Sequence, residues 1–440
     1  MFNHKHIWNI SYPIFLSLLA QNIINVTDTA FLGRIGEVEL GASALGGLVY
    51  ICAFTLAFGF STGSQIVIAR RNGEQEYGRI GAVMIQGIFF LISMAIIIFI
   101  LVRLLAAPMM SMLVSSSAIL DATVEFLNLR VFGLFFSFLN VMFRAFFVGV
   151  TRTRVLTINA LLMAITNIIL DYILIFGHAG FPAMGIKGAA IASVCAEAVS
   201  ILFFVLYMCL TVDLKKYGLN RIYAPDLRLL KRILGTSIFT MLQQFISMST
   251  FFFFFIAMEH IGQRELAVAN IIRSIYVVMF IPVNSLSTAV NSLVSNAIGA
   301  GRTDQVTGII KKVALLSLFI MAGCAVVFCL IPEAILSIYT NSQSLIADSI
   351  PSIYTISGAM LICAAGSVVF NGVSGTGNTL AALKFEVVTL VFYCTFIYIV
   401  GIRLKLPVHV CFTSEIIYFG LLLVMSAVYI KKGRWKNKKI

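Results

Sequence analysis

Residues 10–32 read ISYPIFLSLLAQNIINVTDTAFL, a run long enough to span a bilayer that nevertheless carries an aspartate, Asp28, among apolar neighbours. At ~1.5 Å per residue, Asp28 lies roughly 27 Å along a helix from Ile10, in the far third of a hydrocarbon core about 30 Å thick. Gln21 and Asn25 precede Asp28 at the spacing of one helix face. Lipid would reject such a polar face, so it must point toward protein or a water-filled cavity.

An ionisable group inside a membrane span is by default a candidate for handling ions or protons. The alternative is that Asp28 lies close enough to the membrane interface for its carboxylate to reach water. The rest of the chain bears on this choice.

The composition is that of a membrane protein. The chain has 440 residues, of which 60% are hydrophobic and only 11% charged, and its mean hydropathy is +1.01, whereas about a quarter of a soluble domain is charged. The amino terminus has no small-residue cleavage site after a short apolar core, so we expect the first span to be retained as an anchor. We therefore predict an all-α, polytopic protein of the lipid bilayer, placed in the cell membrane, the inner membrane of a bacterium. Its twelve predicted spans lie near 10–32, 42–69, 80–102, 122–148, 155–177, 186–211, 235–258, 266–297, 309–331, 347–373, 381–401 and 408–430.

The net charge of +13 is explained by where the basic residues lie. Of the 31 lysines and arginines, 22 fall on one side of the predicted membrane, in the amino-terminal segment, alternate loops and the carboxyl tail. By the positive-inside rule both termini are cytoplasmic, and Asp28 is near the external side. The charge therefore gives no reason to expect a nucleic-acid partner.

The cysteines and histidines do not suggest an enzyme. Eight cysteines are scattered without a C-x-x-C pair, and five histidines are dispersed near span ends, so neither a metal cluster nor a nucleophile–base pair is indicated. We expect no cofactor apart from H⁺ or Na⁺ as a coupling ion, and no metal site beyond a possible sodium site.

An internal repeat divides the chain into two halves. IGEVEL begins at Ile35 and IGQREL at Ile261, an offset of 226 in the numbering. The same offset relates Ser61 to Ser287, Thr62 to Thr288 and Gly73 to Gly299, and a further match relates GVTRT from Gly149 to GVSGT from Gly372 at an offset of 223. We predict two pseudo-symmetric six-helix bundles, an amino-terminal lobe over 1–211 and a carboxyl-terminal lobe over 235–440 with a basic cytoplasmic tail, joined by a basic cytoplasmic linker over 212–234.

Two parallel six-helix bundles facing a central cavity are typical of transporters that work by alternating access. Pro13 removes a backbone hydrogen bond in the first span, so we expect it to allow a helix bend. The repeat also exposes an asymmetry, because Asp28 corresponds to Phe254 at the offset of 226. The function of Asp28 is therefore expected in the amino-terminal half alone.

A second acid lies at a matching depth. The span 155–177 carries Asn167 and Asp171, four residues apart and therefore on one helix face. Asp171 is roughly 24 Å from Val155 at ~1.5 Å per residue, nearly the depth of Asp28. Two carboxyl groups at one depth in one bundle would form a buried acid pair.

A buried pair of like charges tends to hold a proton and titrates as a unit. We predict that the pair takes up and releases the coupling proton, or binds sodium through Asp28, Asn167 and Asp171, with Gln21 and Asn25 as further hydrogen-bond partners. The alternative is that these groups only bond helices to one another and have no role in transport.

Other charged residues in or near the spans are expected to pair structurally; these are Arg130, Arg144, Glu197, Arg273 and Glu415. Glu386, two residues from Lys384, is interpreted as lying at the membrane interface.

Four segments together resemble one transporter family. They are NVTDTAFLGRIGEVELGASALG at 25–46, NIILDYILIFG at 167–177, GIKGAAIASV at 185–194 and GAGRTDQV at 299–306. The set resembles the multidrug and toxic compound extrusion (MATE) family over essentially the whole chain. The resemblance implies twelve helices in two lobes and a cation-coupled antiporter that exports small organic cations and amphipathic compounds; we expect it to be a monomer.

Within that resemblance, V-x-D-T and N-x-x-x-D correspond to Asp28 and to Asn167 with Asp171, as in the DinF-like branch with its cation site in the amino-terminal lobe. Gln21 matches a glutamine of that branch, Pro13 its bendable proline, and Ser193 stands near a family threonine. The NorM-like and eukaryotic branches carry an additional glutamate in helix 7.

The chain departs from those branches at that point. Helix 7 here reads TMLQQFIS, with Gln243 and Gln244 and no glutamate. This departure favours the amino-terminal site over one in the second lobe.

Three other functions compete with the antiporter. A lipid-linked oligosaccharide flippase of the same superfamily would more often have extra spans and a basic cavity. A membrane-embedded transferase should cluster histidine, aspartate or arginine at one membrane face, and a passive channel would not require two lobes with an unequal acid.

Overall fold

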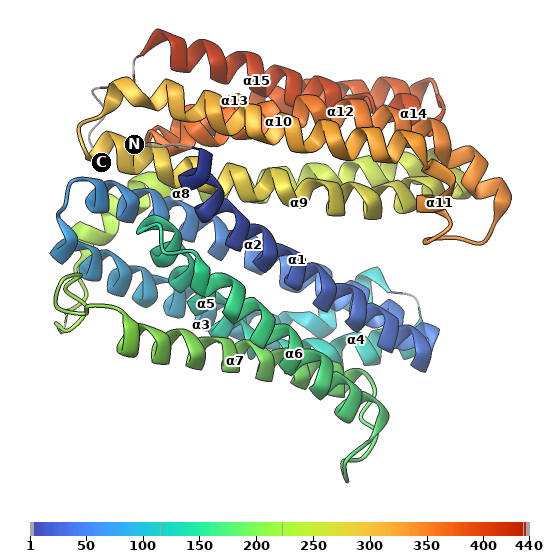
Figure 1. Cartoon of the computed structure of the whole chain (residues 1–440). Helices are drawn as coiled ribbons and strands as arrows, with labels where there is room; N and C mark the ends of the chain where they lie inside the picture. Colours follow the sequence, from blue (N-terminus) through green and yellow to red (C-terminus); the bar gives the residue numbers. More distant parts are fainter. Residues whose placement is uncertain (1–3, 115, 222, 434, 437–440) are drawn as a thin grey trace. The chain divides into compact units, whose positions relative to one another are not determined.

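The computed structural model of the chain describes residues 4–114, 116–221, 223–433 and 435–436 (Figure 1). Helix makes up 86% of these described residues, and no strand occurs among them. Arg434, Lys438 and Lys439, counted above in the basic tail, lie outside the described residues.

The predicted all-α membrane architecture is confirmed. Eleven helices are long and apolar enough to cross a membrane, and α4 with α5, bent by 51° at their junction, would make a twelfth, all within the residues that the structure describes. In chain order the elements are α1 (His4–Ile35), α2 (Glu37–Gly73), η1 (Tyr77–Arg79), α3 (Ile80–Leu113), α4 (Ser117–Arg130), α5 (Gly133–Gly149), α6 (Arg154–Phe176), α7 (Ile186–Thr211), α8 (Leu227–Ile261), α9 (Gln263–Gly299), η2 (Thr303–Gln305), α10 (Val306–Leu330), α11 (Pro332–Leu336), α12 (Gln343–Gly375), α13 (Thr379–Ile397), η3 (Tyr398–Arg403), α14 (Val408–Cys411) and α15 (Ser414–Lys432).

The chain divides into two compact units. The amino-terminal unit is Leu16–Met241, and the carboxyl-terminal unit combines Met1–Phe15 with Leu242–Ile440. α1 and α8 each run from one unit into the other. The lobe boundaries expected from the sequence, at 1–211, 212–234 and 235–440, stay a prediction.

Within the carboxyl-terminal unit, the first turns of α1 are tied to α9, where the Ser285 hydroxyl donates to the Ser11 carbonyl at 2.6 Å. Pro13 lies inside α1, two residues before Phe15, the last residue that α1 contributes to this unit. The helix continues through the proline, and a functional bend at Pro13 stays a prediction.

The internal repeat is visible in the helices. α2 and α9 are each 37 residues long, and both of their ends differ in number by 226. The turns that follow also match, because Gln75 and Gly301 take the same left-handed conformation, with φ of 59° and 72°. Further on, Ser116 caps α4 and Ser342 caps α12, again at an offset of 226. The predicted offset is confirmed.

One sequence match was aligned wrongly. α5 ends at Gly149 and α12 at Gly375, and the left-handed residues that follow are Thr151 and Gly377, so the offset remains 226. The match of Gly149 with Gly372, at an offset of 223, is therefore three positions out. The letters G and V recur one turn earlier inside α12, whereas the left-handed residue marks the end of the helix.

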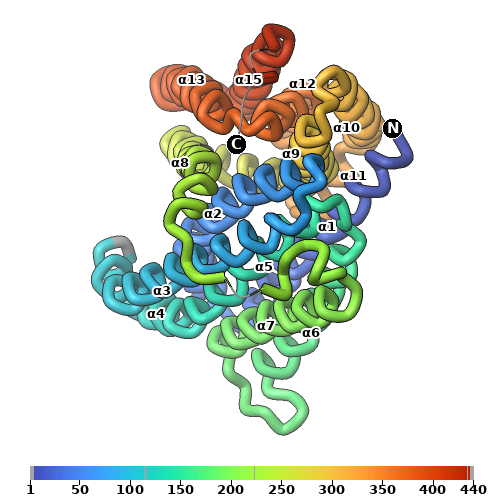
Figure 2. The backbone as a smooth tube through the Cα atoms, turned by 90° about the vertical axis from the view of Figure 1, so that its left-hand side faces the viewer, coloured from blue at the N-terminus to red at the C-terminus, as the bar shows by residue number. Residues whose placement is uncertain are grey.

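The repeat extends to the packing of the helices. In the amino-terminal unit α2 contacts α3, α4 and α5, and α7 contacts α4, α5 and α6. In the carboxyl-terminal unit α9 contacts α10 and α12, and α15 contacts α12 and α13. Figure 2 shows α6 beside α7 and, in the other unit, α13 beside α15. The unbroken α12 therefore takes the place of the bent pair α4 and α5.

Small residues set the approach of α6 to α7. A Cβ atom at Gly188 would lie 2.7 Å from the backbone carbonyl of Leu174, so only glycine allows the two helices to come this close. Ala189 and Ala190 continue the buried face. This contact fixes α6, which carries Asn167 and Asp171.

The linker before α8 is bonded to the amino-terminal unit. The Gln86 side chain donates to the Ala224 carbonyl at 2.8 Å and accepts from the Asp226 amide at 2.9 Å. The Asp226 carboxylate in turn accepts from the amides of Arg228 and Leu229 and so caps the start of α8. The linker is thus an ordered part of this unit.

Candidate functional site

The acid pair is positioned by an apolar contact between α1 and α6. Ala20 and Ile24 of α1 form one buried cluster with Ala160 and Ala164 of α6. Because residues three or four apart share a helix face, the next position on α1 is Asp28, and the next positions on α6 are Asn167 and Asp171. The cluster therefore brings polar side chains of the two helices together one turn further along.

Asn167 joins the two carboxyl groups. With its amide nitrogen turned toward them, it donates to Oδ1 of Asp28 at 2.9 Å and to Oδ2 of Asp171 at 3.3 Å. Asn167 and Asp171 are fully buried, whereas Asp28 is half-buried. The predicted convergence of these three side chains is present in the structure.

The two carboxyl groups lie within hydrogen-bonding reach of each other. Two ionised carboxylates cannot remain this close in an apolar interior, so a proton or another cation must compensate one charge. Oδ1 of Asp171 is buried and has no hydrogen-bond partner, which leaves an oxygen free to accept such a cation. The chemistry that the geometry allows is reversible binding of H⁺ or a small oxygen-seeking cation.

Apolar side chains close the site on the next turn. Leu32 packs with Ile175 in a buried cluster, and the rings of Phe31 and Phe176 meet edge to face with centroids 5.5 Å apart. The acid pair thus lies between two apolar clusters. This surrounding raises the cost of leaving a bare charge there.

The other predicted site residues are not hydrogen-bonded to this triad in the structure. Gln21 and Asn25 lie on α1 with exposed side chains, and Ser193 lies on α7 with a partly exposed side chain. Their roles in binding the coupling ion stay predictions.

Arg130 and Glu197, two of the five charged residues expected to pair structurally, pair with each other. The guanidinium donates to both carboxylate oxygens, at 2.7 and 2.9 Å, and lies 3.7 Å from the centre of the Tyr50 ring. The Tyr50 hydroxyl donates to Glu197 at 2.9 Å. Gly133 makes room for the pair, because a Cβ there would clash with both the guanidinium and the carboxylate. The charge of Glu197 is therefore neutralised within the same unit as the acid pair.

Sequence reasoning missed the rest of this network. Ser137 contacts the Tyr50 hydroxyl at 2.8 Å, and the Ser200 hydroxyl joins the amides of Asn140 and Asn159 at 2.6 to 2.9 Å. The available signal was weak, because single polar residues on separate spans show no fixed spacing in the sequence.

The interfacial interpretation of Glu386 was wrong. Its side chain is buried, with only 1% of the residue exposed, and it accepts a hydrogen bond from the Tyr418 hydroxyl at 2.5 Å. A residue near a helix end can be enclosed by neighbouring helices, which the local sequence does not reveal.

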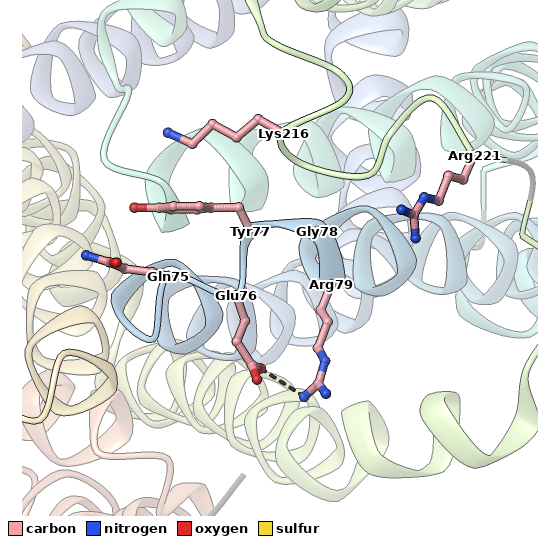
Figure 3. A pocket seen from close by; sticks show the side chains of 7 residues that line it. All are labelled: Gln75, Glu76, Tyr77, Gly78, Arg79, Lys216 and Arg221. Atoms are coloured by element: carbon pink, nitrogen blue, oxygen red, sulfur yellow. Dashed lines mark hydrogen bonds and ion pairs between the residues drawn. The ribbon is translucent and has the colours of Figure 1, made fainter.

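A surface pocket of about 500 Å³ lies elsewhere in the amino-terminal unit, where η1 meets the linker (Figure 3). It is rich in charged side chains, and the Lys216 ammonium lies 4.2 Å from the centre of the Tyr77 ring. Arg79 there is paired with Glu76 at 2.9 Å. Since α1 and α2 run in opposite directions, this pocket and the acid pair are at opposite ends of the unit.

Comparison with known proteins agrees with the repeat. The sequence profile of the family described as MatE matches residues 13–173 and again residues 240–399, once in each half. The chain belongs to the MatE family. This membership agrees with the resemblance to multidrug and toxic compound extrusion proteins.

Several MatE relatives carry the same name. The protein called "Probable multidrug resistance protein NorM" in Thermotoga maritima is 25% identical over 393 residues, covering 88% of this chain and 83% of that protein. Its namesake in Photorhabdus laumondii is 26% identical over 355 residues, covering 80% of this chain and 77% of that protein. Membership of the DinF-like branch is not specifically supported by these relatives.

Solved structures show the MatE fold directly. An outward-facing multidrug resistance MATE family transporter of the MOP superfamily superposes with a TM-score of 0.89 at 19% identity, over 99% of this chain and 97% of that chain. A MOP superfamily transporter from Pyrococcus furiosus superposes with a TM-score of 0.87 at 20% identity, over 98% and 95%. These likenesses establish a multi-pass membrane fold.

Proposed function

We propose that this chain is a cation-coupled antiporter that exports small organic cations or amphipathic drugs from the cell by alternating access. The observation that carries the proposal is the triad of Asp28, Asn167 and Asp171, which holds two carboxyl groups together inside an apolar surrounding. Membership of the MatE family and the names of its relatives support the substrate class.

The chemistry of coupling follows from the charge of the pair. When H⁺ or Na⁺ is bound, the net negative charge at Asp28 and Asp171 is reduced, and the pair is tolerated in its apolar surrounding. When the ion leaves, the uncompensated charge favours either a positively charged substrate or a conformation that readmits the ion. Transport arises if the site opens to opposite sides of the membrane in these two states.

The position of the acid pair supports the DinF-like branch, because the carboxyl groups that converge are those of the amino-terminal unit. At the repeat offset, Asp28 corresponds to Phe254, which is buried against Phe412 with ring centroids 4.9 Å apart. We infer that the coupling ion for export binds in the amino-terminal unit.

We propose further that both termini are cytoplasmic and that the protein works as a monomer in the bacterial inner membrane. The distribution of 22 basic residues on one side supports the orientation. The acid pair would then lie toward the external side of the membrane.

The test is export of a fluorescent organic cation by reconstituted vesicles, driven by a proton gradient and, separately, by a sodium gradient. We expect one gradient to drive export by the native protein, and Asp28→Asn and Asp171→Asn each to abolish it. Asp121→Asn, which alters an exposed acid at the start of α4, is the matched control and should export normally.

Two results would contradict the proposal. If neither gradient moves any of a panel of organic cations, the chain is no drug antiporter, and movement of a lipid-linked oligosaccharide should be measured next. If both substitutions export normally, the acid pair only bonds α1 to α6.

A further inference from the structure

The carboxyl-terminal unit has an acid site of its own, centred on Glu415 of α15. The Tyr393 hydroxyl donates to one carboxylate oxygen at 3.4 Å and the Tyr276 hydroxyl to the other at 3.5 Å. Glu415 is partly buried. Both donors are neutral, so neither compensates a negative charge.

Glu386 of α13 forms the buried end of the same cluster. It accepts a hydrogen bond from the Tyr418 hydroxyl at 2.5 Å. Tyr418 connects the two acids, because its ring packs against that of Tyr393 with centroids 5.9 Å apart and it lies within electrostatic reach of both carboxyl groups. The five residues Tyr276, Glu386, Tyr393, Glu415 and Tyr418 are called the tyrosine–glutamate cluster below.

The internal repeat relates part of this cluster to the amino-terminal unit. Tyr276 is the counterpart of Tyr50 at the offset of 226, and each tyrosine donates to a glutamate on the sixth span of its own unit, Glu415 on α15 and Glu197 on α7. The two units therefore contain similar tyrosine–glutamate pairs, in which the tyrosines match at the repeat offset and the glutamates, 218 residues apart, lie at different heights on the sixth span.

The arginine is missing from the second copy. At the same offset, Arg130 corresponds to Ile356, a buried residue of α12, and Gly133, which makes room for the guanidinium, corresponds to Ala359. α4 and α5 bend directly after Arg130, whereas α12 continues without a break. Glu415 thus bonds to the counterpart of Tyr50, but without the arginine that compensates the charge of Glu197.

The groups that face the cluster carry no positive charge. From the elements packed against it, the titratable neighbours are Tyr276 on α9, Cys363 on α12, Tyr393, Cys394 and Glu386 on α13, and Tyr418 on α15. Two basic residues are close in sequence to these groups. Lys384, two residues before Glu386, has an exposed side chain, and the Arg273 guanidinium, three residues before Tyr276, lies 5.0 Å from the centre of the Phe255 ring. Among the residues that the structure describes, neither glutamate forms an ion pair.

A buried polar group beside Glu415 is also unsatisfied. Ser414 is completely buried, its hydroxyl faces the hydroxyl of Tyr393, and Oγ has no hydrogen-bond partner of normal geometry. Thr389, on the face of α13 that carries Glu386 and Tyr393, is likewise buried and unpartnered. Neither hydroxyl supplies a positive charge to the cluster.

We propose that the tyrosine–glutamate cluster is a second proton-binding site, in which a proton on Glu415 or Glu386 replaces the charge that Arg130 supplies in the amino-terminal unit. A proton fits better than a metal ion, because hydroxyl donors already occupy carboxylate oxygens and no group of three or more metal-binding side chains occurs among the described residues. The site is independent of the Asp28–Asp171 pair and does not rest on drug export.

The test is infrared difference spectroscopy of the purified full chain without substrate, between about pH 5 and about pH 9. We expect the carboxylic C=O band of the native protein to change with pH, and Glu415→Gln and Glu386→Gln each to remove part of that change. Glu333→Gln, an exposed glutamate of the same unit, should leave the spectra unchanged. Because no transport is measured, failure here is distinct from failure of the antiport proposal.

A second variant tests the role of the missing arginine. Ile356→Arg with Ala359→Gly recreates the arrangement of Arg130 and Gly133, so we expect it to hold Glu415 ionised and to remove the same part of the band as Glu415→Gln. Tyr276→Phe should move the Glu415 component to a higher wavenumber, because the carboxyl group loses a hydrogen-bond donor.

The proposal is overturned if both glutamine variants keep the full native band change, or if the band responds to sodium at constant pH and not to pH. It is also overturned if the folded Ile356→Arg, Ala359→Gly protein keeps the Glu415 component.

Discussion

Glu197 and Glu415 accept from the repeat-related tyrosines Tyr50 and Tyr276 but differ in how their charge is compensated. This difference should be measurable as stability. Glu197→Gln leaves Arg130 buried without its partner, and breaking a buried ion pair in this way costs about 3 to 5 kcal/mol. Glu415→Gln removes no ion pair, so it should cost far less. Thermal unfolding in detergent, measured for both variants against the native protein, compares the two directly.

Equal loss of stability in the two variants would contradict this account of the residues. It would mean that Glu415 is also held by an opposite charge.

Among individual residues, the sequence predicted the site members that stand out as polar residues within apolar spans. Asp28, Asn167 and Asp171 were found because a polar residue inside an apolar span is conspicuous and because helical spacing places Asn167 and Asp171 on one face. Gln21 and Asn25 follow the same spacing, yet their side chains are exposed. Spacing assigns residues to a face of a helix but does not say which part of that face meets a neighbour.

The cluster that contains Glu386 and Glu415 was not predicted, because its members are not conspicuous in the sequence. Their partners, Tyr276, Tyr393 and Tyr418, are distributed over α9, α13 and α15, and a tyrosine in a span is not conspicuous. The one available clue was that Tyr50 and Tyr276 are separated by the repeat offset.

The contact between α1 and α6 should control the acid pair even though it contains no acid. Ala164→Phe would place a large ring in the buried cluster with Ala20 and Ile24, and overpacking of this kind costs about 1 to 3 kcal/mol. We expect α1 to be displaced, Asp28 to separate from Asp171, and gradient-driven export to fall at least about tenfold.

Ile165→Phe is the matched control, because Ile165 is the next residue of α6 and its side chain is 57% exposed. It should export at the native rate. If Ala164→Phe also exports normally while folded, the apolar contact does not position the pair.

The helices themselves were largely predictable. Apolar runs about twenty residues long located all the spans, since an uninterrupted apolar surface is what a bilayer requires. The break between α4 and α5 was not predicted. Arg130 and Gly133, which flank it, meet Glu197 of a helix that is distant in the sequence. The match of Gly149 with Gly372 was misaligned because GVSGT resembles GVTRT by letters, while the structure follows the left-handed residue.

The proposed orientation of the whole molecule can be tested by labelling. In a chain freed of its eight native cysteines, Ala179→Cys lies in the loop between α6 and α7, and Asp213→Cys lies in the linker before α8. We expect a membrane-impermeant maleimide to label Ala179→Cys in intact cells, and Asp213→Cys only after the cells are permeabilised. Labelling in the reverse order would place the acid pair toward the cytoplasm.

The two units share one arrangement of helices but differ in how the charges of their acidic side chains are compensated. The amino-terminal unit neutralises Glu197 with Arg130 and leaves the Asp28–Asp171 pair to accept a cation, whereas the carboxyl-terminal unit has no such arginine and no counterpart of Asp28 among its described residues. The repeat could be detected in the sequence, but this division of charge required knowing which helices meet.

The central claim is that the Asp28–Asp171 pair exchanges a cation for substrate. The most direct measurement is the H⁺ or Na⁺ released when an exported organic cation is added to the purified protein in weakly buffered solution. If the substrate and the ion compete for this pair, binding of the substrate must release the bound ion. We therefore expect about one ion to be released per protein by the native chain and by Asp121→Asn. The double variant Asp28→Asn, Asp171→Asn should release none at the same substrate occupancy; release equal to that of the native protein would contradict the account.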